Sequence, residues 1–336
     1  MSVPEVYAFD PSSRRDSDFV AGGLQHLVVG NRGRLLDVRR TPITVVDVAA
    51  VRGQFTVRID AFEDMGTCWE LALDEVTRFQ FARGSVVADA VVTAALEQAR
   101  DAFDRVLTIE VDPGARRESL DRVDHYRALV RVWLAERAAA MSVDVGALVE
   151  RRAGDPILYE LLEEFLDERG LGELEAVFST TFVSNPRSGE VVKGHAIVLA
   201  ELGLCPYHGK IPRDPELLSG AWSRSRRSEH LLWRMAFTQE LLSRAGLTDL
   251  VLFRGAASDS EIRPAATRAS FVSATLSRSV AEAHFAGGPT THVAVLWRQR
   301  VPLQRALMTF LETRAMNNQY QEAEAVLVGD PSNNVF

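Results

Sequence analysis

The spacing of apolar residues changes twice along this chain of 336 residues. Short strand-like runs fill residues 43–82, a helical period follows over residues 86–169, and strand-like runs return after Leu247. Helices and strands bury different faces, so each change of period limits which elements can share a core. Helices followed by a run of strands predict an α+β fold, and the length predicts two domains or one domain with a substantial extension.

The first strand-like region predicts a small β-barrel-like module over residues 27–85. Short strands joined by tight turns are typical of small barrels or curled sheets. Residues 1–26 are mostly polar and mixed, and we expect them to form an N-terminal extension. The runs that predict the module are ITVVDVAA (43–50), QFTVRIDAF (54–62), CWELALDEV (68–76) and TRFQFA (77–82).

The middle of the chain predicts a helical segment over residues 86–172. Apolar residues recur there at helical spacing in three stretches, and Gly170 follows the last of them, where a glycine commonly ends a helix. The three stretches are residues 86–108, 118–141 and 155–169.

The remaining residues, 173–336, form the predicted C-terminal domain. Val191–Leu202 could be strand or helix, residues 205–215 are typical of a loop, and residues 228–244 have a helical period. Five strand-like runs follow, interrupted by one short predicted helix, SVAEAHF (279–285).

The composition argues against several kinds of partner and site. The formal net charge of -8 gives no general attraction to nucleic acid or to an anionic membrane. Cys68 and Cys205 lie in no CxxC pair, so we expect neither a zinc site nor a disulfide framework. The first residues lack an apolar leader, and no apolar run approaches the roughly 18 residues that span a bilayer. We therefore predict a cytoplasmic protein without membrane contact, and export by a signal-independent route stays open.

Three short polar signals occur in order among the C-terminal runs. Arg254 ends the apolar run LVLFRG. The run SFVSAT, which contains Ser273 and Thr275, leads into the short helix. Glu322 and Glu324 precede the last apolar run, and residues two apart in a strand face the same side. We therefore expect these two carboxylates to project together.

Each signal alone has a more ordinary explanation. An arginine at a strand end is usually a surface charge, a Ser/Thr cluster before a helix usually caps it, and paired glutamates usually form a solvated strand face. Together, in this order, they match what cleavage of NAD requires. A cation binds the diphosphate, hydroxyl groups orient a ribose, and a carboxylate stabilises the positive charge that develops as the glycosidic bond breaks.

The three signals resemble the arginine–serine–glutamate class of ADP-ribosyltransferases, which includes catalytic subunits of bacterial binary toxins and vertebrate ecto-transferases. The resemblance covers about residues 228–330 and implies that residues 173–336 are a catalytic domain with a split β-sheet ADP-ribosyltransferase fold. Ala274 departs from the family pattern, because it replaces the middle Thr of a Ser-Thr-Ser strand. The matching motifs are Phe253-Arg254-Gly255, Ser273-Ala274-Thr275 and Glu322-Ala323-Glu324.

The resemblance implies a role for each matched residue. Arg254 would bind phosphate or ribose of NAD, and the Gly255 backbone would hold the nicotinamide amide. Ser273 would orient Glu324, and Thr275 would help to shape the site. Glu324 would bond the 2′-hydroxyl of the nicotinamide ribose and stabilise an oxocarbenium-like transition state. NAD is the expected co-substrate, and the mechanism needs no metal.

Glu322 bears on the acceptor. In this class a Glu two residues before the catalytic Glu goes with arginine acceptors, since a guanidinium must lose a proton before it attacks. The loop ETRAMNNQYQ (312–321) would contact the acceptor, with Tyr320 as a platform for a planar group. Tyr320 could equally be an ordinary exposed residue. Phe285 could pack near the nicotinamide or could equally be a core residue of its helix.

The sequence therefore predicts a toxin-like enzyme, a mono-ADP-ribosyltransferase that modifies a macromolecule, with protein arginine as the default acceptor. Three rivals stay open: ADP-ribosylation of a nucleic acid, NAD hydrolysis with water as the acceptor, and an inactive binding module of the same fold. The parts before residue 173 could recognise a target or bind a regulatory partner.

Two basic stretches could contact a phosphate-rich partner, but each has a simpler explanation. WSRSRRSEH (222–230) is typical of a basic helix start on an acidic protein. NRGRLLDVRR (31–40) gives the β-module a basic edge without the interleaved aromatic residues of a nucleic-acid surface.

Overall fold

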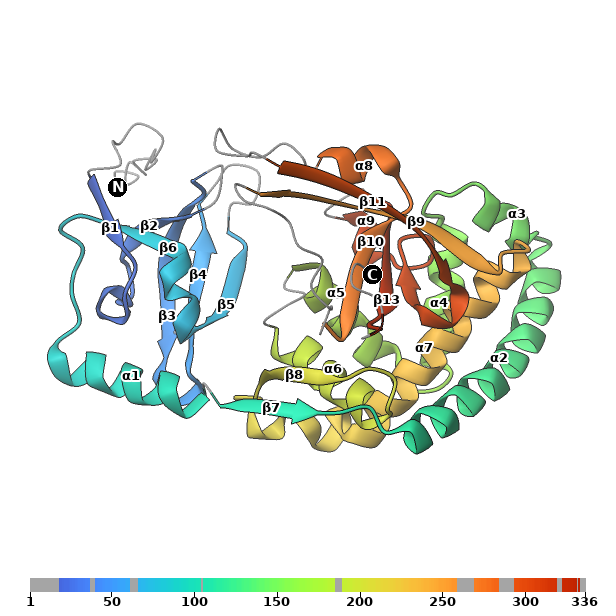
Figure 1. The fold of residues 1–336 in the computed structure, drawn as a ribbon, viewed down its shortest axis with the longest axis horizontal. Helices are drawn as coiled ribbons and strands as arrows, with labels where there is room; N and C mark the ends of the chain where they lie inside the picture. Colours follow the sequence, from blue (N-terminus) through green and yellow to red (C-terminus); the bar gives the residue numbers. More distant parts are fainter. Residues whose placement is uncertain are drawn as a thin grey trace, which may run out of the picture. The chain divides into compact units, whose positions relative to one another are not determined.

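The computed structural model describes residues 18–36, 40–60, 66–103, 105–184, 189–258, 269–283, 293–318, 322–330 and 332. The chain divides into two compact units, Met1–Arg105 and Val106–Phe336 (Figure 1). Each unit has its own hydrophobic core. Helices combine with antiparallel sheets, as an α+β chain requires.

The first unit contains one six-stranded antiparallel sheet in the order β1-β6-β2-β3-β4-β5. Alternate residues of its strands, such as Val45, Phe55 and Phe81, are buried in one core. Leu96 of helix α1 (Ala90–Phe103) packs against the same core. The strands are β1 (Phe19–Ala21), β2 (Arg32–Leu35), β3 (Pro42–Ala49), β4 (Gln54–Ile59), β5 (Cys68–Ala72) and β6 (Phe79–Ala82), with short 3-10 turns at Leu24–His26, Ala50–Arg52 and Leu73–Arg78.

The second unit contains a helical part in which several helices start at side-chain caps. Asp112 accepts a hydrogen bond from Gly114 N (2.7 Å) at the start of α2, and Asp155 accepts one from Ile157 N (2.9 Å) at the start of α4. In both helices a proline occupies the first position, where its missing N–H is not needed. The helices are α2 (Pro113–Met141), α3 (Val145–Glu150), α4 (Pro156–Asp167), α5 (Gly172–Ser184), α6 (Glu190–Glu201) and α7 (Arg224–Arg244).

Helix α7 lies in the core of the second unit. Its residues are buried on several sides, whereas a surface helix buries only one stripe. On the side of α2, Glu240 accepts hydrogen bonds from Arg131 at 2.8 and 3.0 Å. On the side of the sheet, the Gln239 side chain donates to the backbone oxygen of Ala306 at 3.3 Å. The helical part and the sheet therefore share one core.

The sheet of the second unit has five antiparallel strands in the order β11-β9-β10-β13-β12. All five strand-like runs predicted after Leu247 form these strands, and the predicted short helix forms α8 (Arg278–Ala283). The strands are β9 (Asp249–Ser258), β10 (Phe271–Thr275), β11 (Val293–Pro302), β12 (Ala306–Thr309) and β13 (Glu324–Val328), with a 3-10 turn at Leu303–Arg305 and helix α9 (Ala315–Asn318) before β13.

Two local expectations are wrong for the same reason. Helical spacing predicts a helix as far as residue 108, but Val106–Ile109 form strand β7. Residues 205–215 are typical of a loop, but they contain β8 (Tyr207–Lys210), which pairs with β7, and a 3-10 turn begins at Pro215. Each strand exists because of a partner far along the chain, which local spacing does not reveal. Val191–Leu202, which allowed strand or helix, corresponds to helix α6.

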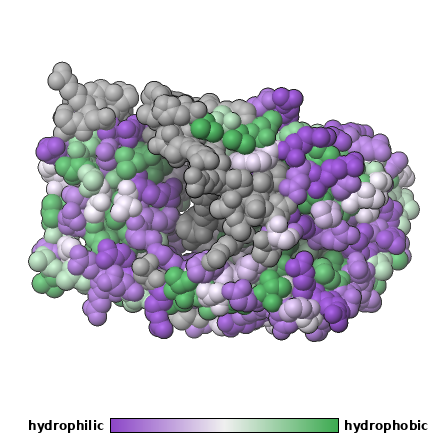
Figure 2. All heavy atoms as spheres, in the orientation of Figure 1, coloured by the Kyte–Doolittle hydropathy of each residue, from purple (hydrophilic) through white to green (hydrophobic). Residues whose placement is uncertain are grey.

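The described helices include none that is long and apolar enough to cross a membrane. Figure 2 shows hydrophilic and hydrophobic residues interspersed on the face that it draws. Exposed valines gather just before and at the start of α1, at Val86, Val87, Val91 and Val92.

Candidate active site

The candidate site lies where strands β9, β10 and β13 are neighbours in the sheet. Arg254 belongs to β9 and Ser273 to β10, while Glu324 begins β13. Thr275, at the end of β10, is paired with Phe253 on one side and with Glu324 on the other. The order of the strands therefore brings together three signals that are widely separated in the sequence.

Six of the eight predicted site residues line one cleft of about 240 Å³. Val280 and Ala281 of α8 also line it, so this short helix forms part of the wall. The other two predicted residues, Phe285 and Tyr320, lie outside the described residues. The six are Arg254, Gly255, Ser273, Thr275, Glu322 and Glu324.

The central contact of the cleft joins Ser273 to Glu324. The exposed Ser273 hydroxyl donates a hydrogen bond to Oε1 of the half-buried Glu324 carboxylate. Burial raises the pKa of Glu324, the Ser273 hydrogen bond opposes the rise, and the nearby charge of Glu322 adds to it. An acidic side chain with a raised pKa in a cleft is a candidate functional group.

The backbone before Glu324 is a turn and not the strand that the sequence predicted. β13 begins at Glu324, and Ala323 has a φ of 47°, a left-handed conformation that non-glycine residues rarely adopt. Thr275 holds this turn, because its hydroxyl donates to the backbone oxygen of Glu322 at 2.6 Å. Glu322 and Glu324 do line the same cleft, but strand alternation is the wrong reason for it.

Arg254, Gly255 and Ala274 complete the described cleft. Arg254 is half-buried and is paired across the sheet with Trp297 of β11. Gly255 follows it in β9. Ala274, which departs from the family pattern, is 5% exposed and belongs to the hydrophobic core.

Two residues of the basic stretch 222–230, Arg227 and His230, are buried. Arg227 is 0% exposed and donates to the backbone oxygens of Leu217 (2.9 Å) and Val191 (3.1 Å). Burial lowers the pKa of Arg227 to about 10. Arg224 is exposed and pairs with Glu201 at 3.0 Å. These contacts favour the structural explanation over a phosphate-rich partner.

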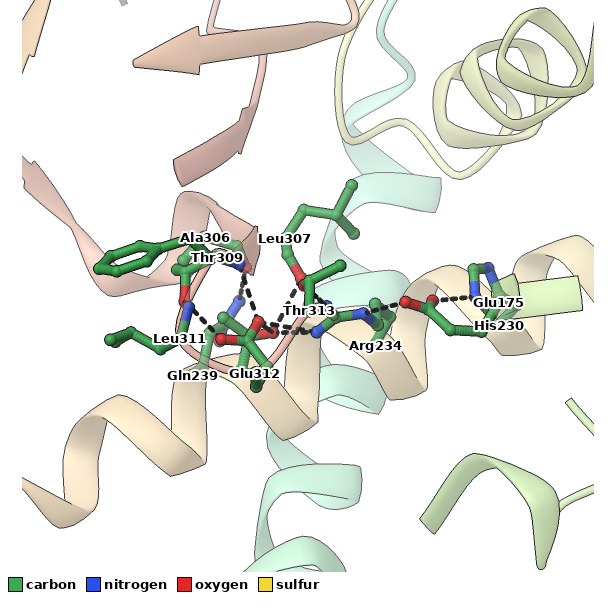
Figure 3. Close-up of polar contacts among 12 residues, drawn as sticks. Glu175, His230, Arg234, Gln239, Ala306, Leu307, Thr309, Leu311, Glu312 and Thr313 are labelled. Atoms are coloured by element: carbon green, nitrogen blue, oxygen red, sulfur yellow. Dashed lines mark hydrogen bonds and ion pairs between the residues drawn. The ribbon is translucent and has the colours of Figure 1, made fainter. Parts of the chain in front are cut away.

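Sequence reasoning missed a buried polar network around Arg234 of α7 (Figure 3). Arg234 is 0% exposed and bonds Glu175 of α5 (3.2 Å) and Glu312 after β12 (3.0 Å). A signal was present in the sequence, because Arg227, His230, Arg234 and Thr238 recur at helical spacing in a stretch that also carries apolar residues at helical spacing. Polar residues on one stripe of a buried helix predict partners in the core.

Within the described part of the chain, no group of three or more His, Cys, Asp and Glu residues is placed to hold a metal ion. Comparison with known proteins yields no relative for this chain: no protein-family model, no curated protein and no solved structure matches it.

Proposed function

We propose that the chain is a mono-ADP-ribosyltransferase that cleaves NAD and transfers ADP-ribose to a macromolecule, with residues 173–336 forming a split-sheet transferase domain. The observation that supports this most directly is the hydrogen bond from Ser273 to Glu324 in a cleft that Arg254 also lines. A hydroxyl-oriented carboxylate in a cleft that an arginine also lines matches the needs of NAD better than those of a general anion site.

Each residue of the cleft has a place in the cleavage step. Arg254 binds the negatively charged diphosphate of NAD or its ribose, and the Gly255 backbone binds the nicotinamide amide. The bond between the ribose carbon and the nicotinamide nitrogen breaks, and nicotinamide leaves with the electron pair. Ionised Glu324, held by Ser273, bonds the ribose 2′-hydroxyl and stabilises the positive charge left on the ribose.

Glu322 serves the acceptor step. A protonated guanidinium is a poor nucleophile, so the attacking nitrogen must lose a proton as its new bond to the ribose carbon forms. Glu322 lines the cleft beside Glu324 and can accept that proton. Arginine is therefore the preferred acceptor.

The direct test is to incubate the purified chain with adenine-labelled NAD, a cell lysate and, separately, purified nucleic acid. Label on protein together with released nicotinamide is the expected result. Label on nucleic acid would replace arginine as the acceptor, and nicotinamide release without labelled macromolecule would favour hydrolysis. A folded chain that releases no nicotinamide under any of these conditions would overturn the enzymatic proposal.

A separate variant tests the proposed role of Glu322 in the acceptor step. Glu322→Gln removes the proton acceptor but leaves Glu324 in place, so transfer to arginine should fall by about 10²-fold or more while NAD hydrolysis continues. Equal loss of transfer and hydrolysis would contradict a role confined to the acceptor.

A further inference from the structure

We propose that Glu312 is a positioning residue for the transferase reaction: from the buried core it fixes the turn that holds the backbone of Glu324 and begins the predicted acceptor loop. This inference rests on the proposed function, which supplies the role of Glu324. Its structural basis is a series of hydrogen bonds that leads from α7 through Glu312 to strand β12 (Figure 3).

Glu312 is held firmly on the side of α7. Its carboxylate is 0% exposed, and Oε1 accepts a hydrogen bond from Nη1 of Arg234 at 3.0 Å. The Thr238 hydroxyl lies 3.0 Å from the same oxygen and 2.9 Å from the backbone oxygen of Leu307. Removing one member of a buried ion pair lowers the stability of the fold strongly, because the other charge then stays in the core without that partner.

On its other side Glu312 holds the end of β12. Its Oε1 accepts from the backbone N–H of Thr309 at 2.8 Å, and its Oε2 accepts from the Thr309 hydroxyl. Thr309 is paired with Ala325, and the next backbone N–H, that of Phe310, donates to the carbonyl oxygen of Glu324 at 2.8 Å. Glu312 therefore bonds Thr309, and the adjacent residue, Phe310, bonds the backbone of Glu324.

The same network fixes the start of the loop predicted to contact the acceptor. Nη2 of Arg234 donates to the Thr313 hydroxyl at 2.6 Å, and the Thr313 N–H donates to the Thr309 carbonyl at 3.1 Å. Arg314 then makes two hydrogen bonds to Glu163 of α4, at 2.7 and 3.0 Å. The chain from Thr309 to Arg314 is therefore attached to two helices before it enters the loop.

Glu175 offers a matched control on the same arginine. It is 6% exposed, accepts from Nε of Arg234 at 3.2 Å and accepts from Nε2 of His230 at 2.8 Å. Both of these donors belong to α7, so Glu175 shares the burial and the ionic partner of Glu312 but does not bond β12. A variant at Glu175 loses core stability without releasing the turn at Thr309.

The first experiment compares Glu312→Gln with Glu175→Gln in NAD cleavage at several pH values. Glu312→Gln should lower kcat roughly tenfold, the scale of a lost hydrogen bond to a charged group, with little change in KM for NAD. The pH below which NAD cleavage declines should also rise, because a displaced Glu324 loses the Ser273 hydrogen bond that favours its ionised form. Glu175→Gln should leave kcat within about twofold of the parent, and this pH unchanged, despite its lower stability. Identical kinetics in the two variants would overturn the positioning role.

The second experiment does not depend on activity. Hydrogen exchange of the Phe310 amide, measured without NAD and at a temperature where both variants stay folded, reports the contact with the Glu324 carbonyl directly. Exchange should be roughly tenfold faster in Glu312→Gln than in Glu175→Gln. If the parent chain releases no nicotinamide, the proposed function fails, but this comparison still tests whether Glu312 holds the backbone of Glu324. Equal exchange rates would overturn the link from Glu312 to Glu324.

Discussion

Glu312 and Glu324 are two carboxylates at the same end of the β12–β13 pairing, and their surroundings differ in charge. Glu312 is 0% exposed and is neutralised by Arg234. Glu324 is half-buried, receives the Ser273 hydroxyl and lies near the like charge of Glu322, so its pKa is raised. The two carboxylates therefore differ in the partners that the surrounding elements supply.

Glu175 shows how strongly a cation changes the outcome. Burial alone would raise the pKa of its carboxyl, but the charge of Arg234 and the His230 hydrogen bond lower it to about 2. A carboxylate paired in this way stays ionised and joins helices. Glu324 instead receives a hydroxyl and lies near a like charge, so its pKa is raised, and its ionised form is the one that meets the developing cation.

The largest expected effect concerns Glu312, the carboxylate with a structural role. Glu312→Ala should lower the free energy of unfolding by about 3–5 kcal/mol, because Arg234 keeps its charge in the core without that partner. Glu324→Ala, at a half-buried site, should cost less than about 1 kcal/mol. Urea unfolding of both variants measures the difference, and equal losses would contradict the assignment of the two roles.

The second prediction concerns Glu324, the carboxylate with the proposed catalytic role. Glu324→Gln keeps the size of the side chain but removes the negative charge that stabilises the ribose cation. Nicotinamide release should fall by about 10²–10³-fold, and the unfolding midpoint should hardly change. Steady-state assays with the folded variant measure this, and a loss smaller than tenfold would count against Glu324 as the catalytic carboxylate.

The third prediction concerns pH. Cleavage requires ionised Glu324, so the rate should fall as pH drops through its pKa, which is raised above the ordinary 4.5. Glu322→Gln removes a like charge, which should lower the pKa of Glu324. The decline of nicotinamide release at acid pH, its acid limb, should therefore move to lower pH. Ser273→Ala removes the hydrogen bond that favours ionisation and should move it to higher pH. Each shift should be below about one pH unit, or roughly 1.4 kcal/mol. Shifts of the opposite sign would contradict the effects assigned to the Glu322 charge and the Ser273 hydrogen bond.

The smallest expected effect concerns the turn between the two glutamates. Ala323 adopts a φ of 47°, which glycine tolerates without penalty, so Ala323→Gly should raise stability by at most about 1 kcal/mol. The looser turn should also lower the ratio of transfer to hydrolysis. Ala325→Gly is the matched control, because Ala325 is buried in β13 and should lose stability instead. Equal changes in the two variants would show that the left-handed backbone is not strained.

Local spacing predicted the C-terminal strands, including the four-residue strand β12. The five C-terminal strands and the short helix α8 appear where the sequence placed them. Strand β7 was missed because its four residues depend on pairing with β8. The predicted strand at Glu322 was wrong because Thr275, from a different strand, holds the Glu322 carbonyl in a turn.

The sequence by itself identified six residues of the cleft, because Arg254, Ser273 and Glu324 stand in recognisable motifs. Only the tertiary structure decided their surroundings. The order β9-β10-β13 brings the motifs together, and the path of α7 through the core gives Glu312 a cation while Glu324 receives a hydroxyl. The physical reason is that the charge state of a buried carboxylate depends on partners contributed by other elements, and a local pattern does not specify those partners.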